Sequence, residues 1–260
     1  MIVRRWFAAA VVAASVGVTM QVVVQGQRGG APGSPPPSPR VSAPIDLTGY
    51  WVSVVSEDWR YRMVTPTKGD YQGVPMTPEA VKVADAWDPV ADTAAGNQCK
   101  SYGAAAIMRV PGRVHLTWQD DNTLRLDADA GAQTRTFRFD KSTPKGEASW
   151  QGESVATWET PNVGRGRAAR PDAPKTGSLK VVTTNMKAGY LRKNGVPYSE
   201  NAVLTEYFDL ARMSTGDQLL VVTAIVDDAT FLRQPFIVST QFKKQADAKG
   251  WDPAPCSATW

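Results

Sequence analysis

The chain has 260 residues, with 29 Lys and Arg, 25 Asp and Glu, one histidine and a formal net charge of +4. The whole excess lies in residues 1–44, which contain Arg4, Arg5, Arg28 and Arg40 and no acidic residue. Residues 45–260 therefore carry as many acidic as basic side chains. Because salt-dependent binding to a phosphate backbone requires a cluster of cations, this balance argues against a nucleic-acid partner.

Residues 1–25 have the features of an export signal. The start MIVRR is positively charged, and residues 6–24 form an uncharged and largely apolar run. If this segment is cleaved, the mature protein is periplasmic or secreted. If it is retained, it anchors the chain in the membrane, because about 20 apolar residues span a bilayer. We therefore expect an exported protein whose only membrane contact is through residues 6–24.

The segment 26–44 is dominated by Gly, Pro and Ser. Such a composition buries too little apolar surface to offset the entropy of ordering, so we expect a tether that is extended where Pro is dense. The remaining residues, 45–260, are long enough for one substantial core and uniform in composition. The sequence predicts a single domain there.

Period-two alternation of apolar and polar residues dominates this domain and predicts about ten short strands separated by turn formers. The runs are residues 48–55, 105–110, 113–119, 123–129, 134–139, 154–159, 178–185, 202–209, 218–228 and 235–244. Because the exposed edges of such a sheet must be closed or covered, we expect a mainly β protein in which an antiparallel meander closes into a barrel-like or strongly curled sheet. A sandwich is the alternative.

One segment, residues 77–87, is typical of a helix, with Thr77 as N-cap and Pro78 at the first helical position. Residues 162–178 are rich in Gly, Pro and Arg without periodicity, which predicts a loop between two strands. The loop carries Arg165, Arg167 and Arg170. The WDP at residues 251–253 is interpreted as turn chemistry.

The two cysteines, Cys99 and Cys256, are expected to form a disulfide, because exported chains meet oxidising conditions and an even number of thiols can pair there. The sequence offers no metal site, since His115 is the only histidine and no CxxC is present. We expect no cofactor.

Three stretches resemble a group of exported, β-rich bacterial proteins. Residues 152–159 match GxSxxxWE, and residues 205–208 match TE(R/Y)F. Residues 227–236 match DDPxxYxxPF except that Ala229 replaces the Pro and that the aromatic is Phe231, one position before the Tyr of the pattern, where this chain has Leu232. The resemblance covers residues 97–244 and implies an exported β fold, but no activity or catalytic residue. The GxW at residues 49–51 is also similar to the opening of lipocalin-like barrels.

Alternation in residues 113–119 places His115 on the opposite face of its strand from Leu116 and its other apolar neighbours. If the polar face of the sheet lines a cavity, its ionisable and amphipathic side chains would contact a small apolar or aromatic ligand. The candidates are His115, Arg125, Trp158, Glu206 and Tyr207.

The sequence favours a non-enzymatic binder of a small hydrophobic or aromatic molecule. One alternative is a barrel-type hydrolase, hydratase or isomerase, with His115 as general base and Glu206 or an Asp as its partner. The other is a structural or accessory subunit of a cell-envelope complex. No catalytic residue is assigned, because Ser154 follows only one glycine of the GxSxG elbow.

Overall fold

The computed structural model describes residues 36–140, 146–160 and 176–259. The predicted signal segment, most of the predicted tether, and Arg165, Arg167 and Arg170 lie outside these ranges. Residues 37–259 belong to one compact unit. Within the described ranges, the structure contains no helix with the length and apolar character that crossing a bilayer requires.

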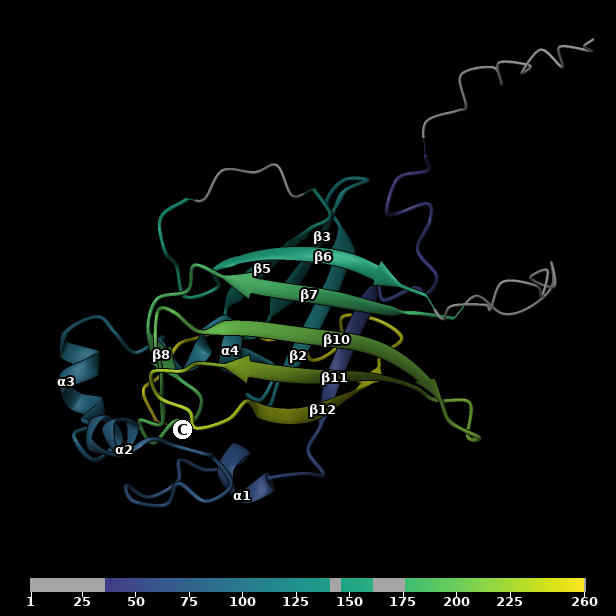
Figure 1. Cartoon of the computed structure of the whole chain (residues 1–260). Coiled ribbons are helices and arrows are strands. Elements are labelled where there is room, and N and C mark those ends of the chain that lie inside the picture. The colour runs from purple at the N-terminus through teal and green to yellow at the C-terminus, as the bar shows by residue number, and fades with distance from the viewer. Residues whose placement is uncertain (1–35, 141–145, 161–175, 260) are drawn as a thin grey trace, which may run out of the picture. The chain divides into compact units, whose positions relative to one another are not determined.

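The described chain forms a closed barrel of nine strands that follow one another in chain order (Figure 1). The ring closes because β1 pairs with both β2 and β12. This confirms the predicted mainly β fold and its closure into a barrel. The strands are β1 (Gly49–Val54), β2 (Arg113–Trp118), β3 (Thr123–Ala128), β5 (Gln133–Arg138), β6 (Glu153–Glu159), β7 (Ser178–Thr184), β10 (Val203–Arg212), β11 (Gln218–Asp227) and β12 (Phe236–Lys244).

One strand pair departs from the antiparallel meander. β5 and β6 run parallel over the short register Phe137↔Ser154 and Arg138↔Val155. The other neighbours in the barrel are antiparallel, and the longest ladder joins β10 to β11 from Val203↔Asp227 to Arg212↔Gln218. A parallel neighbour requires the chain to return to the same end of the sheet, which explains the long connection from β5 to β6.

The interior of the barrel is packed with side chains. Alternate residues of each strand point inward, so that Trp51, Leu116, Phe137 and Phe208 are each fully buried. They belong to one hydrophobic cluster that draws on the whole ring of strands. Most polar residues of the strands lie on the outward faces, and the exceptions inside include Arg135 and Glu206. The barrel is therefore a filled core through this section, and its binding surfaces have to be sought at its wall and ends.

The helices and two small ribbons lie outside the barrel, and α1, α2 and α3 gather at one end of it (Figure 1). A second hydrophobic cluster joins α2, α4 and β9 to the strand ends. The elements are α1 (Trp59–Arg62), α2 (Pro78–Asp85), α3 (Pro89–Ala94), the 3-10 turn η1 (Lys100–Tyr102), α4 (Ala104–Ile107), the parallel pair β4 (Ala130–Gly131) with β13 (Ala254–Pro255), and the antiparallel pair β8 (Gly189–Tyr190) with β9 (Pro197–Tyr198).

The helix predicted at residues 77–87 is confirmed, whereas the strand predicted at residues 105–110 is a helix at its start. The helix expected at residues 77–87 is α2, whose first turn is capped by the Thr77 hydroxyl accepting from the Ala80 N–H at 3.2 Å. The strand expected at residues 105–110 is wrong, because this stretch begins in the buried helix α4. A short apolar run does not distinguish a buried strand from a buried helix, and its alanines favour the helix.

The predicted disulfide is present and joins Cys99, just before η1, to Cys256, just after β13. The cross-link holds the C-terminal tail where β13 pairs with β4. The tail therefore becomes part of the barrel surface, and it places Trp251 against the outer wall beside Tyr50 and His115.

The other end of the barrel is closed by aromatic and cationic side chains. The Lys244 ammonium lies 4.3 Å from the centre of the Trp51 ring and donates to the carbonyl of Thr48. Trp158 packs against Trp118 and Phe139, and its indole N–H donates to the carbonyl of Pro39 at 2.8 Å. The last residues of the predicted tether are thus held against the barrel.

Candidate functional site

A groove of about 310 Å³ lies on the outer wall of the barrel, beside the C-terminal tail. Its volume is at the lower end of the range usual for small-molecule sites. Strands β2, β3 and β5 form its floor, and the tail forms its side. The lining residues are His115, Arg125, Asp127, Ala128, Ala132, Gln133, Thr134, Trp251 and Pro253.

The two aromatic rings that line the groove, those of His115 and Trp251, form a half-buried group with the neighbouring ring of Tyr50. Tyr50 and His115 are paired in the register of β1 and β2, and their rings stack with centroids 3.9 Å apart and an interplanar angle of 3°. The Trp251 ring stands at 69° to the imidazole, with centroids 6.2 Å apart. This edge-to-face arrangement is favourable for aromatic rings and fixes the orientation of Trp251.

The polar part of the groove is an ion pair on β3. Arg125 donates to both carboxylate oxygens of Asp127, through Nε at 3.0 and 2.9 Å and through Nη2 at 2.8 Å. The Thr134 hydroxyl donates to the same carboxylate at 2.6 Å. Asp127 raises the pKa of Arg125 through this hydrogen bond and its charge. The carboxylate is thus held in place by two neighbours.

The histidine is held in its neutral form. Partial burial lowers the pKa of His115, although the charge of Asp127 opposes this effect. His115 and Asp127 are cross-strand partners of β2 and β3. At neutral pH the imidazole therefore presents one donor and one acceptor, and it stacks as an uncharged ring.

The structure brings together two of the five residues that the sequence singled out, His115 and Arg125. Trp158 lies in the aromatic cluster that closes one barrel end. Tyr207 lies on the outer face of β10, with the Lys180 ammonium 5.5 Å from its ring centre. Neither residue lines the groove.

Glu206 lies inside the barrel and is fully buried. Its carboxylate accepts two hydrogen bonds from Arg135, at 2.9 Å from Nη1 and 2.5 Å from Nη2. Arg135 also donates to the Thr183 hydroxyl at 3.3 Å, and Thr183 is hydrogen-bonded to Ser154 at 2.8 Å. The expectation that Glu206 and Tyr207 share one face is wrong, because neighbouring residues of a strand point to opposite faces.

Sequence reasoning missed Asp127 and Trp251, which line the groove, and Tyr50, which stacks on His115 beside it. Asp127 was detectable, because it lies two residues from Arg125 and therefore on the same face of the strand. Tyr50 and Trp251 were not, because the closure of the barrel and the path of the tail bring them beside His115.

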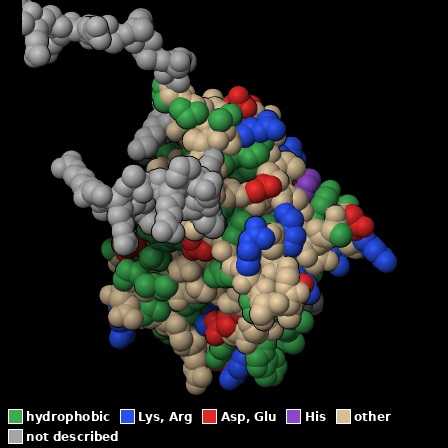
Figure 2. All heavy atoms as spheres, turned by 90° about the vertical axis from the view of Figure 1, so that its right-hand side faces the viewer, with side chains coloured by type: hydrophobic (Ala, Val, Ile, Leu, Met, Phe, Trp, Pro, Cys, Tyr) green, Lys and Arg blue, Asp and Glu red, His purple; other side chains and the backbone are tan. Residues whose placement is uncertain are grey.

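Hollows also lie elsewhere on the described surface, and two of them are larger than the groove. The larger, of about 680 Å³, lies at the barrel end where Ile45, Leu210 and Lys244 meet, and the smaller, of about 430 Å³, lies between α3 and the C-terminal tail. Figure 2 looks toward the barrel end away from the helices and shows basic, acidic and hydrophobic side chains intermixed on that face. The described residues contain no cluster of three His, Cys, Asp or Glu side chains fit for a metal ion.

No family model, curated protein or solved structure matches the chain. The groove is therefore interpreted from its own residues.

Proposed function

We propose that this is an exported binding protein that holds a small aromatic or hydrophobic molecule in the His115 groove without transforming it. The observation that carries the proposal is the juxtaposition, in one concave site, of the His115 and Trp251 rings with the Arg125–Asp127 pair. Small-molecule sites commonly combine an apolar lining with a few fixed polar groups that orient the ligand.

The two parts of the groove suit a flat ligand with a polar edge. Trp251, Pro253 and the small side chain of Ala132 form the apolar surface. Gln133 and the Arg125–Asp127 pair place polar groups at the rim. A ring against Trp251 gains apolar contact and an edge-to-face interaction, and the polar edge gains hydrogen bonds.

The arrangement favours binding over general-base catalysis. Glu206, one suggested partner of His115, is inside the barrel and is held by Arg135. Asp127, the other kind of partner, already accepts from Arg125 and Thr134. A histidine that acts as a general base is usually oriented by a carboxylate that accepts a hydrogen bond from its ring. The carboxylate of Asp127 instead accepts hydrogen bonds from Arg125 and Thr134.

The proposal predicts that Trp251→Ala abolishes retention of the natural ligand. Removing a ring from the groove should cost about 2 kcal/mol of binding, or roughly thirtyfold in affinity, because most of the apolar contact is lost. Native mass spectrometry of protein purified from its own envelope should show a bound small molecule in the wild type but not in the variant.

Trp59→Ala is the matched control, because Trp59 is 65% exposed and lies outside the groove. This variant should retain the ligand as the wild type does.

His115→Ala should weaken retention by no more than about tenfold, since a single neutral contact is worth about 1 kcal/mol. Equal retention by Trp251→Ala and wild type would contradict the proposed site. If the wild type turned over esters, lactones or enones and His115→Ala abolished this activity, the protein would instead be an enzyme that uses His115.

A further inference from the structure

A compact group of four cationic side chains is buried near the end of the barrel that the helices cover. Arg62, Arg109, Arg192 and Lys193 are 2, 6, 5 and 4% exposed. All four line one small cavity, together with Tyr61, Ser101 and apolar neighbours. Charged residues are rarely buried to this extent unless opposite charges compensate them.

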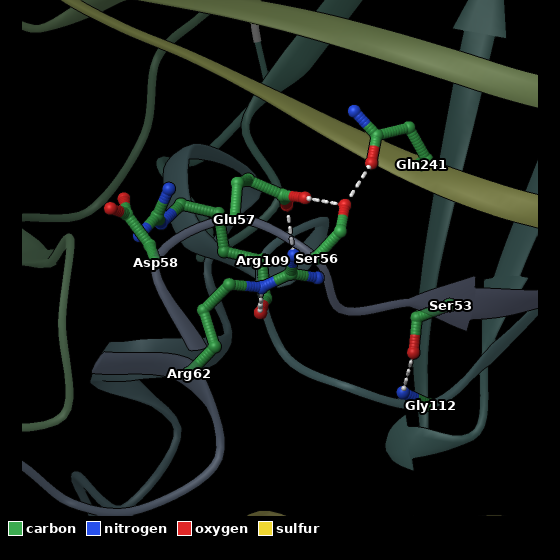
Figure 3. A network of polar contacts seen from close by, with 8 residues as sticks. All are labelled: Ser53, Ser56, Glu57, Asp58, Arg62, Arg109, Gly112 and Gln241. Carbon is green, nitrogen blue, oxygen red and sulfur yellow. Dashed lines mark hydrogen bonds and ion pairs between the residues drawn. The ribbon is translucent and has the colours of Figure 1, made fainter. Parts of the chain in front are cut away.

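Two carboxylates of the connection between β1 and α1 pair with this group. Glu57 forms an ion pair with Arg62, and Asp58 pairs with Arg109 at 3.0 Å (Figure 3). Both carboxylates lie toward solvent, with side chains 29 and 38% exposed. Solvent screens such pairs, so they compensate the buried cations only in part.

The other hydrogen bonds of Arg62 and Arg192 are with neutral atoms. Arg62 Nε donates to the carbonyl of Arg109 at 2.8 Å, and Arg192 Nη1 donates to the carbonyl of Gln72 at 2.7 Å. The Arg192 guanidinium lies 4.0 Å from the centre of the Tyr61 ring. Lys193 donates to the Tyr102 hydroxyl at 2.6 Å.

Three N–H groups of the cavity's arginines are buried and have no hydrogen-bond partner among the described residues. They belong to Arg62 Nη2, Arg109 Nη1 and Arg192 Nε. A buried donor of a charged group without an acceptor is costly, and such groups are rare in folded proteins. Three of them on arginines that share one cavity indicate that an acceptor belongs there.

The electrostatics of the group agree with a missing negative charge. Burial, reinforced by the nearby positive charge of Arg109, lowers the pKa of Arg192 to about 10. Burial lowers the pKa of Lys193 to about 8. Burial is also the largest cause that lowers the pKa of Arg62, and Arg109 again adds to it. Burial thus disfavours the charged forms of Arg62, Arg192 and Lys193, and the charge of Arg109 adds to this effect at the two arginines.

We propose that this cavity is a binding site for a single small monovalent anion of the size of chloride, held by Arg62, Arg109 and Arg192. An anion accepts from the arginine N–H groups and places a negative charge between cations that now repel one another. A water molecule in the same position would accept hydrogen bonds but would not compensate the charge.

The dimensions of the cavity select the class of anion. Its volume is about 20 Å³, and a cavity needs roughly 10–15 Å³ to hold one water-sized occupant. The space therefore suits a single monatomic ion. The site is separate from the His115 groove, since the two share no lining residue.

Bromide, which replaces chloride and scatters anomalously, gives a direct test on the wild-type protein. Crystals grown with sodium bromide in place of chloride should show an anomalous peak in this cavity, within hydrogen-bonding distance of the three arginines. No peak there in crystals that show bromide at other sites would overturn the proposal.

Solution measurements test the same site with a variant. At a constant ionic strength of about 0.15 M, replacing gluconate by chloride should raise the midpoint of thermal unfolding of the wild type, because a ligand that binds only the folded state stabilises it. Arg192→Gln should lose this chloride-dependent shift. Arg212→Gln, which removes an exposed cation at the opposite barrel end, should keep it. An equal shift in Arg192→Gln and wild type would refute the assignment.

Discussion

Replacing Glu206 by Gln should destabilise the protein by about 3–5 kcal/mol, because it leaves the Arg135 guanidinium charged and uncompensated inside the barrel. The side chains of both partners are 1% exposed, so solvent cannot take over the role of the carboxylate. The change conserves volume, which separates the loss of charge from the creation of a cavity. Urea denaturation followed by tryptophan fluorescence measures the free energy of unfolding.

The double variant Arg135→Met with Glu206→Leu is the matched control. It removes both charges and keeps apolar volume in the core, and replacing a whole buried ion pair in this way is often neutral or stabilising. We therefore expect the double variant to be more stable than Glu206→Gln. A loss below about 1 kcal/mol in Glu206→Gln would show that the pair is not buried as described, since such a value is typical of exposed ion pairs.

Removing the disulfide should cost about 5 kcal/mol, the second large effect that we expect. Cys99 and Cys256 are 157 residues apart, and cross-linking so long a loop strongly reduces the entropy of the unfolded chain. The variant Cys99→Ala with Cys256→Ala should therefore unfold at a markedly lower urea concentration. The folded barrel should persist, because the cross-link lies outside the ring of nine strands.

Wild-type protein under reducing conditions is the control and should match the double variant. Peptide mapping without reductant should recover Cys99 and Cys256 in one linked fragment. Two free thiols in native protein, or a variant as stable as the oxidised wild type, would contradict the prediction. Loss of the bond should also loosen the tail that carries Trp251, and so reduce ligand retention in the groove.

The ion pair between Arg135 and Glu206 inside the barrel could not be predicted from the sequence. Arg135 and Glu206 occupy inward positions between apolar residues such as Phe137 and Phe208. Each strand taken alone shows a polar residue where an apolar one is expected. Only the closed ring brings the two side chains to the same place, because β5 and β10 are separated by two other strands.

Two residues predicted for the site, His115 and Arg125, meet because they lie on the same outward face of the adjacent strands β2 and β3. Alternation alone is enough to assign that face. The assignment of Glu206 and Tyr207 to one cavity failed for the same reason, since consecutive residues of a strand alternate in direction. Trp158 lies at a barrel end because it terminates β6, where the closing aromatic cluster packs.

The sequence by itself determined the features that depend on residues close together in the chain. Alternation predicted the nine barrel strands and their buried faces, Thr77 and Pro78 predicted the start of α2, and the need to close sheet edges favoured a barrel over a sandwich. The tertiary structure alone decided which distant side chains meet: the Arg135–Glu206 pair, the rings around His115, and the arginines of the proposed anion site. These contacts depend on barrel closure and on packing between segments far apart in the chain, and local periodicity carries no information about either.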